Sequence, residues 1–520
     1  MNETIPNTHD INSSSIHRGA PPSPRADVQS DQGHDGSVWS VLLLSLFFLV
    51  FAHLSVKDFF PNPVFWVIGA VVIVIAGVAW LVVRKDDLGF LLAIFVCAHF
   101  AFADNQGGFW SYVLCAVFFI GTVLGRRQSI YLLSVPRSTS VLMFIFLIHQ
   151  LLGTVLNPYS LLSNIQATIV ALSQVLIFYY CASQQITESN LKRLLSIWFV
   201  VACWVFVIGL NQHYHWVIAK SPLLPQMYMQ YGKITSIPLG SFGNSELFSE
   251  YFCIVFVLSL VIVSHMKELR ALHIKRIWPL LMIFISSCAM ILGASRAAIL
   301  LAVVATVYIT FFNYFVVPSV RSLKRTFILL PILFLTSLLI LTFGSLVSLD
   351  EMGKKFKTLN PTKLTIDTVV SGEGINRGSV FAPAYQRLRS GSWWLGYGFN
   401  LPENNHESMG FRKTQLGDYH SLYLSLPIYY GWIGATSYVL LIFMAGLRIF
   451  ILYFRKRKID HFLIPVALGF AVIWGVFLLD EYKISVTRNH SYFLLTWMWL
   501  GLTHSVANLL GRIENTPQKI

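Results

Sequence analysis

The sequence predicts an all-α, polytopic membrane protein. Only 12% of the 520 residues are charged and 55% are hydrophobic, whereas roughly a quarter of the residues of a soluble protein are charged. The hydrophobic residues are gathered into runs of about 17–24 residues, and about 20 apolar residues in a helix span the hydrocarbon core of a bilayer. Basic residues are sorted to alternate loops, which gives the chain an orientation.

We expect about 12–14 transmembrane helices, with a large non-cytoplasmic loop before the last three. The span at 421–453 is longer than one crossing requires, so we expect a break near Gly431. Only Ser295 and Arg296 separate two other spans, which must therefore form a tight hairpin. The expected spans are 38–56, 63–83, 88–104, 108–125, 138–156, 163–183, 194–211, 246–266, 277–294, 297–317, 326–348, 421–453, 461–479 and 490–510.

The basic residues favour a cytoplasmic N-terminus. With that orientation most clusters of Lys and Arg fall in cytoplasmic loops, where membrane proteins retain them. The same rule accounts for the net charge of +14, so we expect no nucleic-acid partner. The cytoplasmic clusters are Arg84-Lys85, Arg126-Arg127-Arg137, Lys192-Arg193, Lys267-Arg270-Lys275-Arg276, Arg321-Lys324-Arg325 and Arg455-Lys456-Arg457-Lys458.

Four regions follow from this pattern. Residues 1–37 are polar and lack aromatic side chains. Such a segment cannot bury enough apolar surface to offset its ordering entropy, so we expect a disordered cytoplasmic tail. Residues 38–211 form the N-terminal transmembrane helices and residues 212–510 form a core with two long outer loops. Residues 511–520 are expected to be a second cytoplasmic tail.

Neither the cysteines nor the short motifs indicate a metal or a cofactor. All six cysteines lie in apolar runs and none belongs to a CxxC pair, which is typical of small buried residues. The sequence contains no Walker loop, no HExxH motif and no spacing of a zinc or dinucleotide site. We therefore expect a protein that works without a metal or cofactor.

The long outer loops are at 212–245 and 349–420. The second is about 70 residues long, and loops of that length are usually functional or disordered; its many aromatic residues argue against disorder. Arg binds pairs of phosphate oxygens, and aromatic rings stack on sugars. A phosphate- and sugar-binding loop therefore competes with the simpler interpretation of a solvated, charged loop. Its candidate binding residues are Arg377, Arg387, Arg389 and Tyr397.

Two single residues stand out at the ends of spans. Arg296 lies in the predicted hairpin, and an Arg at membrane depth is a functional hypothesis by default; its alternative role is to snorkel to the outer headgroups. His420 ends the long loop just before a span. Its neutral imidazole could accept a proton from a sugar hydroxyl, although a His at a helix start is more often a cap or a surface residue.

The order of these features resembles the O-antigen ligase and O-antigen polymerase superfamily of bacterial surface polysaccharide synthesis. The resemblance covers roughly residues 235–480, and its motifs are individually short. They are Gly240-Ser241-Phe242-Gly243-Asn244-Ser245, the Ser295-Arg296-Ala297 hairpin, Gly396-Tyr397-Gly398-Phe399-Asn400, His420-Ser421-Leu422-Tyr423 and Gly431-Trp432-Ile433-Gly434.

This resemblance implies metal-independent transfer of a glycan from an undecaprenyl-diphosphate carrier, on the periplasmic face of the bacterial inner membrane. Arg296 corresponds to the hairpin Arg that contacts the diphosphate, and His420 to the His that acts on the acceptor hydroxyl. Region 212–510 is then the glycan-transfer core. The implied partners are the lipid-linked glycan, the bilayer, a chain-length regulator and a flippase. The remaining substrate-binding candidates are Arg377, Arg387, Arg389, Asn244 and Tyr397.

Three functions remain open on these observations. We favour a polymerase of lipid-linked repeat units, because a loop rich in both cations and aromatics suits two lipid-linked glycans at once. The alternative within the enzyme class is an O-antigen ligase that moves glycan onto the lipid A core. The alternative from another class is a flippase for lipid-linked oligosaccharides, which would line its cavity with intramembrane charges, and the predicted spans are nearly free of charge.

Overall fold

The computed structural model describes about half of the chain. The described residues are 95, 99, 135–156, 161–184, 186–214, 229–230, 233–234, 238, 240–242, 244–266, 269, 274–293, 295–316, 388–389, 394–396, 421–459, 461–482 and 490–513. The disordered tail that we expect at 1–37 and most of the loops at 212–245 and 349–420 lie outside them.

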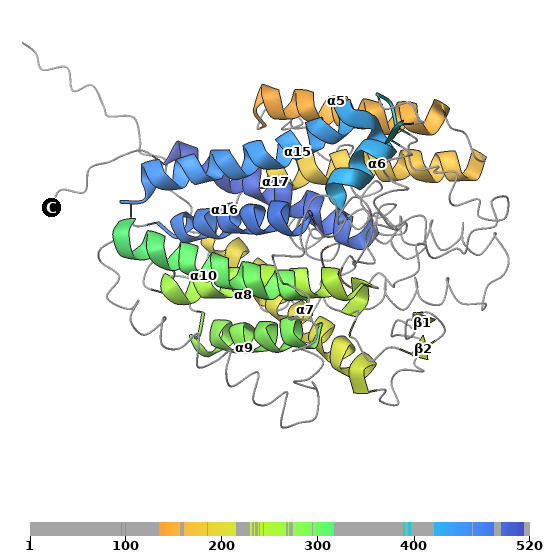
Figure 1. Ribbon diagram of the computed structural model, residues 1–520. Helices are drawn as coiled ribbons and strands as arrows, with labels where there is room; N and C mark the ends of the chain where they lie inside the picture. Colours follow the sequence, from red (N-terminus) through yellow and green to blue (C-terminus); the bar gives the residue numbers. More distant parts are fainter. Residues whose placement is uncertain are drawn as a thin grey trace, which may run out of the picture.

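The described part is a bundle of long helices (Figure 1). Its strands are two residues long each, β1 (Met229–Gln230) and β2 (Lys233–Ile234), and they pair antiparallel. The helices are α5 (Arg137–Leu156), α6 (Leu161–Ala182), α7 (Glu188–Tyr214), α8 (Ser245–Ser264), α9 (Ile277–Leu292), α10 (Arg296–Val316), α15 (Leu422–Lys456), α16 (Leu463–Asp480) and α17 (His490–Arg512), with a 3₁₀ turn η3 at Gly240–Phe242.

These helices confirm an all-α polytopic membrane protein. Among the described residues, α5, α7, α8, α15, α16 and α17 are long and apolar enough to cross a membrane. Each described helix coincides with an expected span to within six residues at either end, and the largest difference is at the start of α7. The expected spans at 38–56, 63–83, 108–125 and 326–348 lie outside the described residues, as does 88–104 apart from Phe95 and His99. The total of about 12–14 spans therefore stays a prediction.

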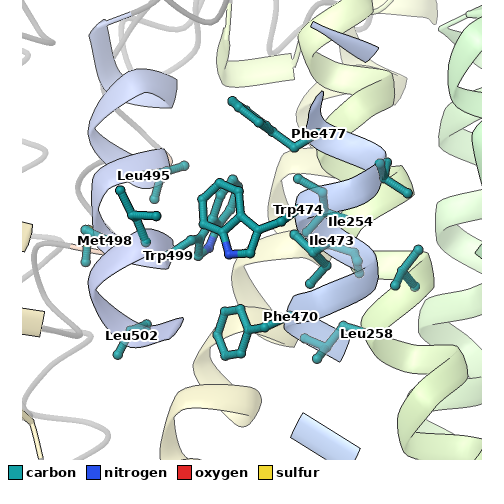
Figure 2. Packing of buried hydrophobic residues seen from close by; sticks show 14 of the residues in the cluster. Ile254, Leu258, Phe470, Ile473, Trp474, Phe477, Leu495, Met498, Trp499 and Leu502 are labelled. Carbon is teal, nitrogen blue, oxygen red and sulfur yellow. The ribbon is translucent and has the colours of Figure 1, made fainter. Parts of the chain in front are cut away.

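Helix α8 is the centre of the bundle. The apolar stretch of this helix is buried along its whole length. A helix that is hydrophobic on all sides has no face suited to water. It packs against α9, α10 and α16. Figure 2 shows its Ile254 and Leu258 beside the row from Phe470 to Phe477 on α16, which in turn faces α17. The indole N–H of Trp474 in this core donates to Thr503 Oγ1 at 2.8 Å.

Glycines let several helices approach each other closely. A Cβ at Gly434 of α15 would lie 2.9 Å from the Cβ of His149 on α5. A Cβ at Gly501 of α17 would be crowded further, at 2.5 Å from both the carbonyl oxygen of Phe178 and the Cβ of Cys181 on α6. Small residues at such crossings allow the backbone contact that holds transmembrane helices together.

The predicted hairpin and the predicted break are both present. Helix α9 ends at Leu292 and α10 begins at Arg296, so the connection is short, and Arg296 is the first helical residue instead of a linker. Within α15, Gly431 has φ 66° and ψ 172°, which is not helical. This residue divides the overlong span into two segments.

Basic residues gather at one end of the bundle, which we call the basic end. Described helices that directly follow one another in the chain alternate in direction, whereas α15 and α17 run the same way: the side chain of Lys456 at the end of α15 donates to the carbonyl of Ile513, just beyond α17, at 2.6 Å. We call the opposite end the Arg296 end. The described basic residues at the basic end are Lys192, Arg193, Lys275, Arg276, Arg455, Lys456, Arg457, Lys458 and Arg512.

We predict that the basic end faces the cytoplasm and the long loop faces outward. In a cysteine-free background, a single cysteine at Ser371 should react with an impermeant thiol reagent in intact cells, whereas one at Arg455 should react only after permeabilisation. Equal labelling in intact cells, or labelling at 455 alone, would contradict this orientation.

Candidate functional site

The Arg296 end brings together the starts of α8, α10, α15 and α17 and the ends of α9 and α16. At the start of α10, Ser295 is buried and receives the first helical N–H groups: Ile299 N donates to its carbonyl at 3.2 Å and Ala298 N to its Oγ at 3.4 Å. Arg296 follows and is half-buried. Its guanidinium charge adds to the partial positive charge of the helix N-terminus, which makes this turn suited to anions.

The hairpin leans on the first turns of α8. Gly293 faces Ser249 and the carbonyl of Ser245, and a Cβ at Gly293 would lie 3.3 Å from that carbonyl oxygen. A larger side chain would lift the hairpin off α8. The close contact therefore fixes where α10 begins relative to α8.

Asn244 begins α8 as its N-cap. Its Oδ1 accepts hydrogen bonds from Glu246 N at 2.7 Å and Leu247 N at 3.1 Å, which satisfies two of the N–H groups that a helix start leaves open. This carbonyl oxygen thus holds the helix. The substrate-binding role that the sequence suggested for Asn244 stays a prediction.

Sequence reasoning missed a group of buried acids at the same end. Glu250 of α8 is fully buried and accepts a hydrogen bond from Tyr492 Oη of α17 at 2.9 Å. Asp480 and Glu481, at the end of α16, are also buried and interact electrostatically with Glu250. Within the described ranges, no such acid group has the geometry of a metal site. The sequence does contain a signal for this group, because a Glu such as Glu250 inside an apolar run is unusual.

The end of α16 also fastens the start of α15. The backbone N–H of Leu422 donates to the carbonyl of Glu481 at 2.9 Å, and Tyr423 Oη donates to the carbonyl of Leu478 at 2.6 Å. An N-terminal donor and the open carbonyls of a C-terminus satisfy each other here. Ser421 is buried against this junction, so the chain that follows His420 is held in one position.

Two described pieces of the long loop touch α15. Gly396 has φ 69°, and a Cβ there would lie 2.6 Å from the carbonyl oxygen of Tyr429; a Cβ at Gly431 would lie 2.7 Å from Leu395 N. Loop and kink therefore meet backbone to backbone, which only two glycines allow. Leu388 also packs on Ile428.

The sequence-predicted residues are only partly covered by these observations. Arg296 and Asn244 lie at the starts of adjacent helices, and Arg389 is exposed next to Leu388. The other predicted site residues, Arg377, Arg387, Tyr397 and His420, lie outside the described residues.

No protein-family model matches the chain, and no curated protein matches it either.

We predict that Gly396→Ala and Gly431→Ala each release the loop from α15. Both residues have positive φ, a conformation that costs other residues roughly 1–3 kcal/mol, and both would clash with backbone atoms. In reconstituted protein, cleavage of the 349–420 loop by an added protease should accelerate on the order of tenfold.

Gly475→Ala is the matched control, because a Cβ there would meet nothing within 4 Å. This variant should be cleaved at the wild-type rate. Wild-type cleavage rates in both loop–kink variants would show that the glycine contact does not hold the loop.

Proposed function

We propose that the protein polymerises undecaprenyl-diphosphate-linked repeat units into an O-antigen, a capsule or an exported polysaccharide, without a metal, on the outer face of the inner membrane. The observation that carries the proposal is a series of contacts between helices at the Arg296 end. The hairpin rests on α8, α8 reaches α17 and α16 through Glu250, and α16 fastens the residues that follow His420. The cationic helix start and the residues that directly follow His420 thus belong to one continuous set of contacts.

In the reaction, the acceptor hydroxyl oxygen attacks the anomeric carbon of the donor while the bond from that carbon to the diphosphate oxygen breaks. The hydroxyl proton passes to the imidazole of His420, and undecaprenyl diphosphate leaves. Negative charge grows on the leaving diphosphate, and Arg296 with the α10 N-terminus is suited to stabilise it. Attack from the face opposite the leaving group inverts the anomeric carbon.

The competing functions retain some support. A ligase would use the same chemistry with a lipid A core acceptor. The flippase alternative gains from the buried Glu250 and the half-buried Arg448, because ionisable groups inside spans often mark transport pathways. Both residues lie within spans that the sequence predicted to be nearly free of charge. Transfer remains favoured, because Arg296 lies at a helix start at one end and not along a central pathway.

We predict that Arg296→Lys loses at least about tenfold in glycan transfer while inserting normally. Lys retains the charge but not the planar fork that binds two phosphate oxygens. Membrane abundance by immunoblot and incorporation of labelled repeat unit are measured together. Arg512→Lys, at the basic end, is the control. Full glycan transfer by the Arg296→Lys protein would show that Arg296 only extends its charge to the outer headgroups.

We predict that purified protein given only the lipid-linked repeat unit produces a ladder of longer lipid-linked chains. His420→Ala should produce no ladder and yet bind the donor like wild type, because the imidazole serves the acceptor. Chains that never lengthen, with transfer only when a lipid A core acceptor is added, would establish the ligase. Movement of the donor across liposomes with neither product would establish the flippase.

A further inference from the structure

An Arg inside α15 is held by α17 near the basic end. Arg448 is half-buried, and its Nη2 donates to Asn508 Oδ1 at 2.7 Å while its Nη1 lies 3.2 Å from His504 Nδ1. His504 and Asn508 are one helical turn apart, so both present their acceptors to the same guanidinium. The two contacts orient the flat cation between the helices.

Both partners of Arg448 are neutral. Arg can only donate, so His504 Nδ1 accepts and the imidazole proton lies on Nε2, which leaves the ring uncharged. In the ranges that the structure describes, no carboxylate forms an ion pair with Arg448. The described part of the bundle therefore leaves its positive charge uncompensated, and an unpaired charge at membrane depth is costly.

The surroundings of Arg448 combine further cations with apolar surface. Arg448 precedes Lys456 by about two helical turns, which is roughly 12 Å at 1.5 Å per residue. It therefore lies farther inside the bundle than the basic residues that end α15. Met444 and Ile451 are one turn to either side on the same face of α15, and they are 41% and 40% exposed. A charged group thus borders a strip of exposed apolar side chains.

We propose that Arg448 binds the phosphodiester of an anionic phospholipid, with His504 and Asn508 as positioning residues and with the acyl chains along the Met444 side of α15. Basic pockets between transmembrane helices on the cytoplasmic side recognise anionic headgroups in this way. The phosphate supplies the negative charge that the described protein does not, and the guanidinium fork fits two of its oxygens. This lipid site is independent of the glycan-transfer site at the other end.

The test uses the full-length protein in neutral detergent, titrated with short-chain phosphatidylglycerol or phosphatidylcholine and followed by thermal unfolding. Wild type should bind phosphatidylglycerol at least about tenfold more tightly, a difference of roughly 1.4 kcal/mol. Asn508→Asp should abolish most of this preference, because the new carboxylate is nearly isosteric and pairs with Arg448 internally. Arg448→Met should abolish it by removing the charge.

Lys458→Gln is the matched control, since Lys458 is an exposed basic residue at the same end; it should keep the preference within about twofold of wild type. A wild-type preference in both Asn508→Asp and Arg448→Met would overturn the proposal and leave Arg448 as a tie between helices. Equal binding of the two lipids by wild type would overturn it as well. Stabilisation by undecaprenyl phosphate without stabilisation by phosphatidylglycerol would assign the site to a polyprenyl phosphate instead.

Discussion

The structure depends on one constraint: a polar group in hydrocarbon must find its partner inside the protein. Several buried hydroxyl groups meet it within their own helix, as Ser264 and Ser287 do by donating to the carbonyl four residues earlier. Longer side chains meet it between helices. The amide of Gln150 on α5 donates to Gln174 on α6 at 2.9 Å, and Trp474 donates to Thr503. These bonds also fix the register between helices that are otherwise held by apolar packing.

Glu250 and Arg448 are two of the described residues that strain this constraint, and they lie toward opposite ends of the bundle. At the Arg296 end, Glu250 accepts a hydrogen bond from Tyr492 Oη on one of its two carboxylate oxygens and has two further acids as neighbours. Toward the basic end, the partners of Arg448 among the described residues are both neutral. A bundle selected for stability alone would replace such groups with apolar residues, because burying charge costs more than packing gains. Their presence is compatible with the two proposals, in which each end of the bundle binds a charged group of its own.

The fold could be predicted from the sequence further than the site could. Span positions depend on local hydropathy, so the expected 246–266 and the observed Ser245–Ser264 nearly coincide. Gly431 could be identified as a break because its span was too long, but its reason is tertiary: Gly396, 35 positions earlier, approaches its backbone. Glu250 could be noticed in the sequence, but only the fold brings Asp480 and Tyr492 to it. Arg296 was expected between helices, whereas the cap formed by Ser295 draws it into α10.

The kink at Gly431 divides α15 into two segments that contact different parts of the protein. Before the kink, Leu422 and Tyr423 are tied to α16, and Ile428 receives Leu388 from the long loop. After it, Gly434 packs on α5, and Arg448 is held by α17. A continuous helix would transmit any tilt of its first turns to Arg448, whereas a break in the hydrogen-bond ladder absorbs it. The kink therefore separates the start of α15, which contacts α16 and Leu388, from the segment that holds Arg448.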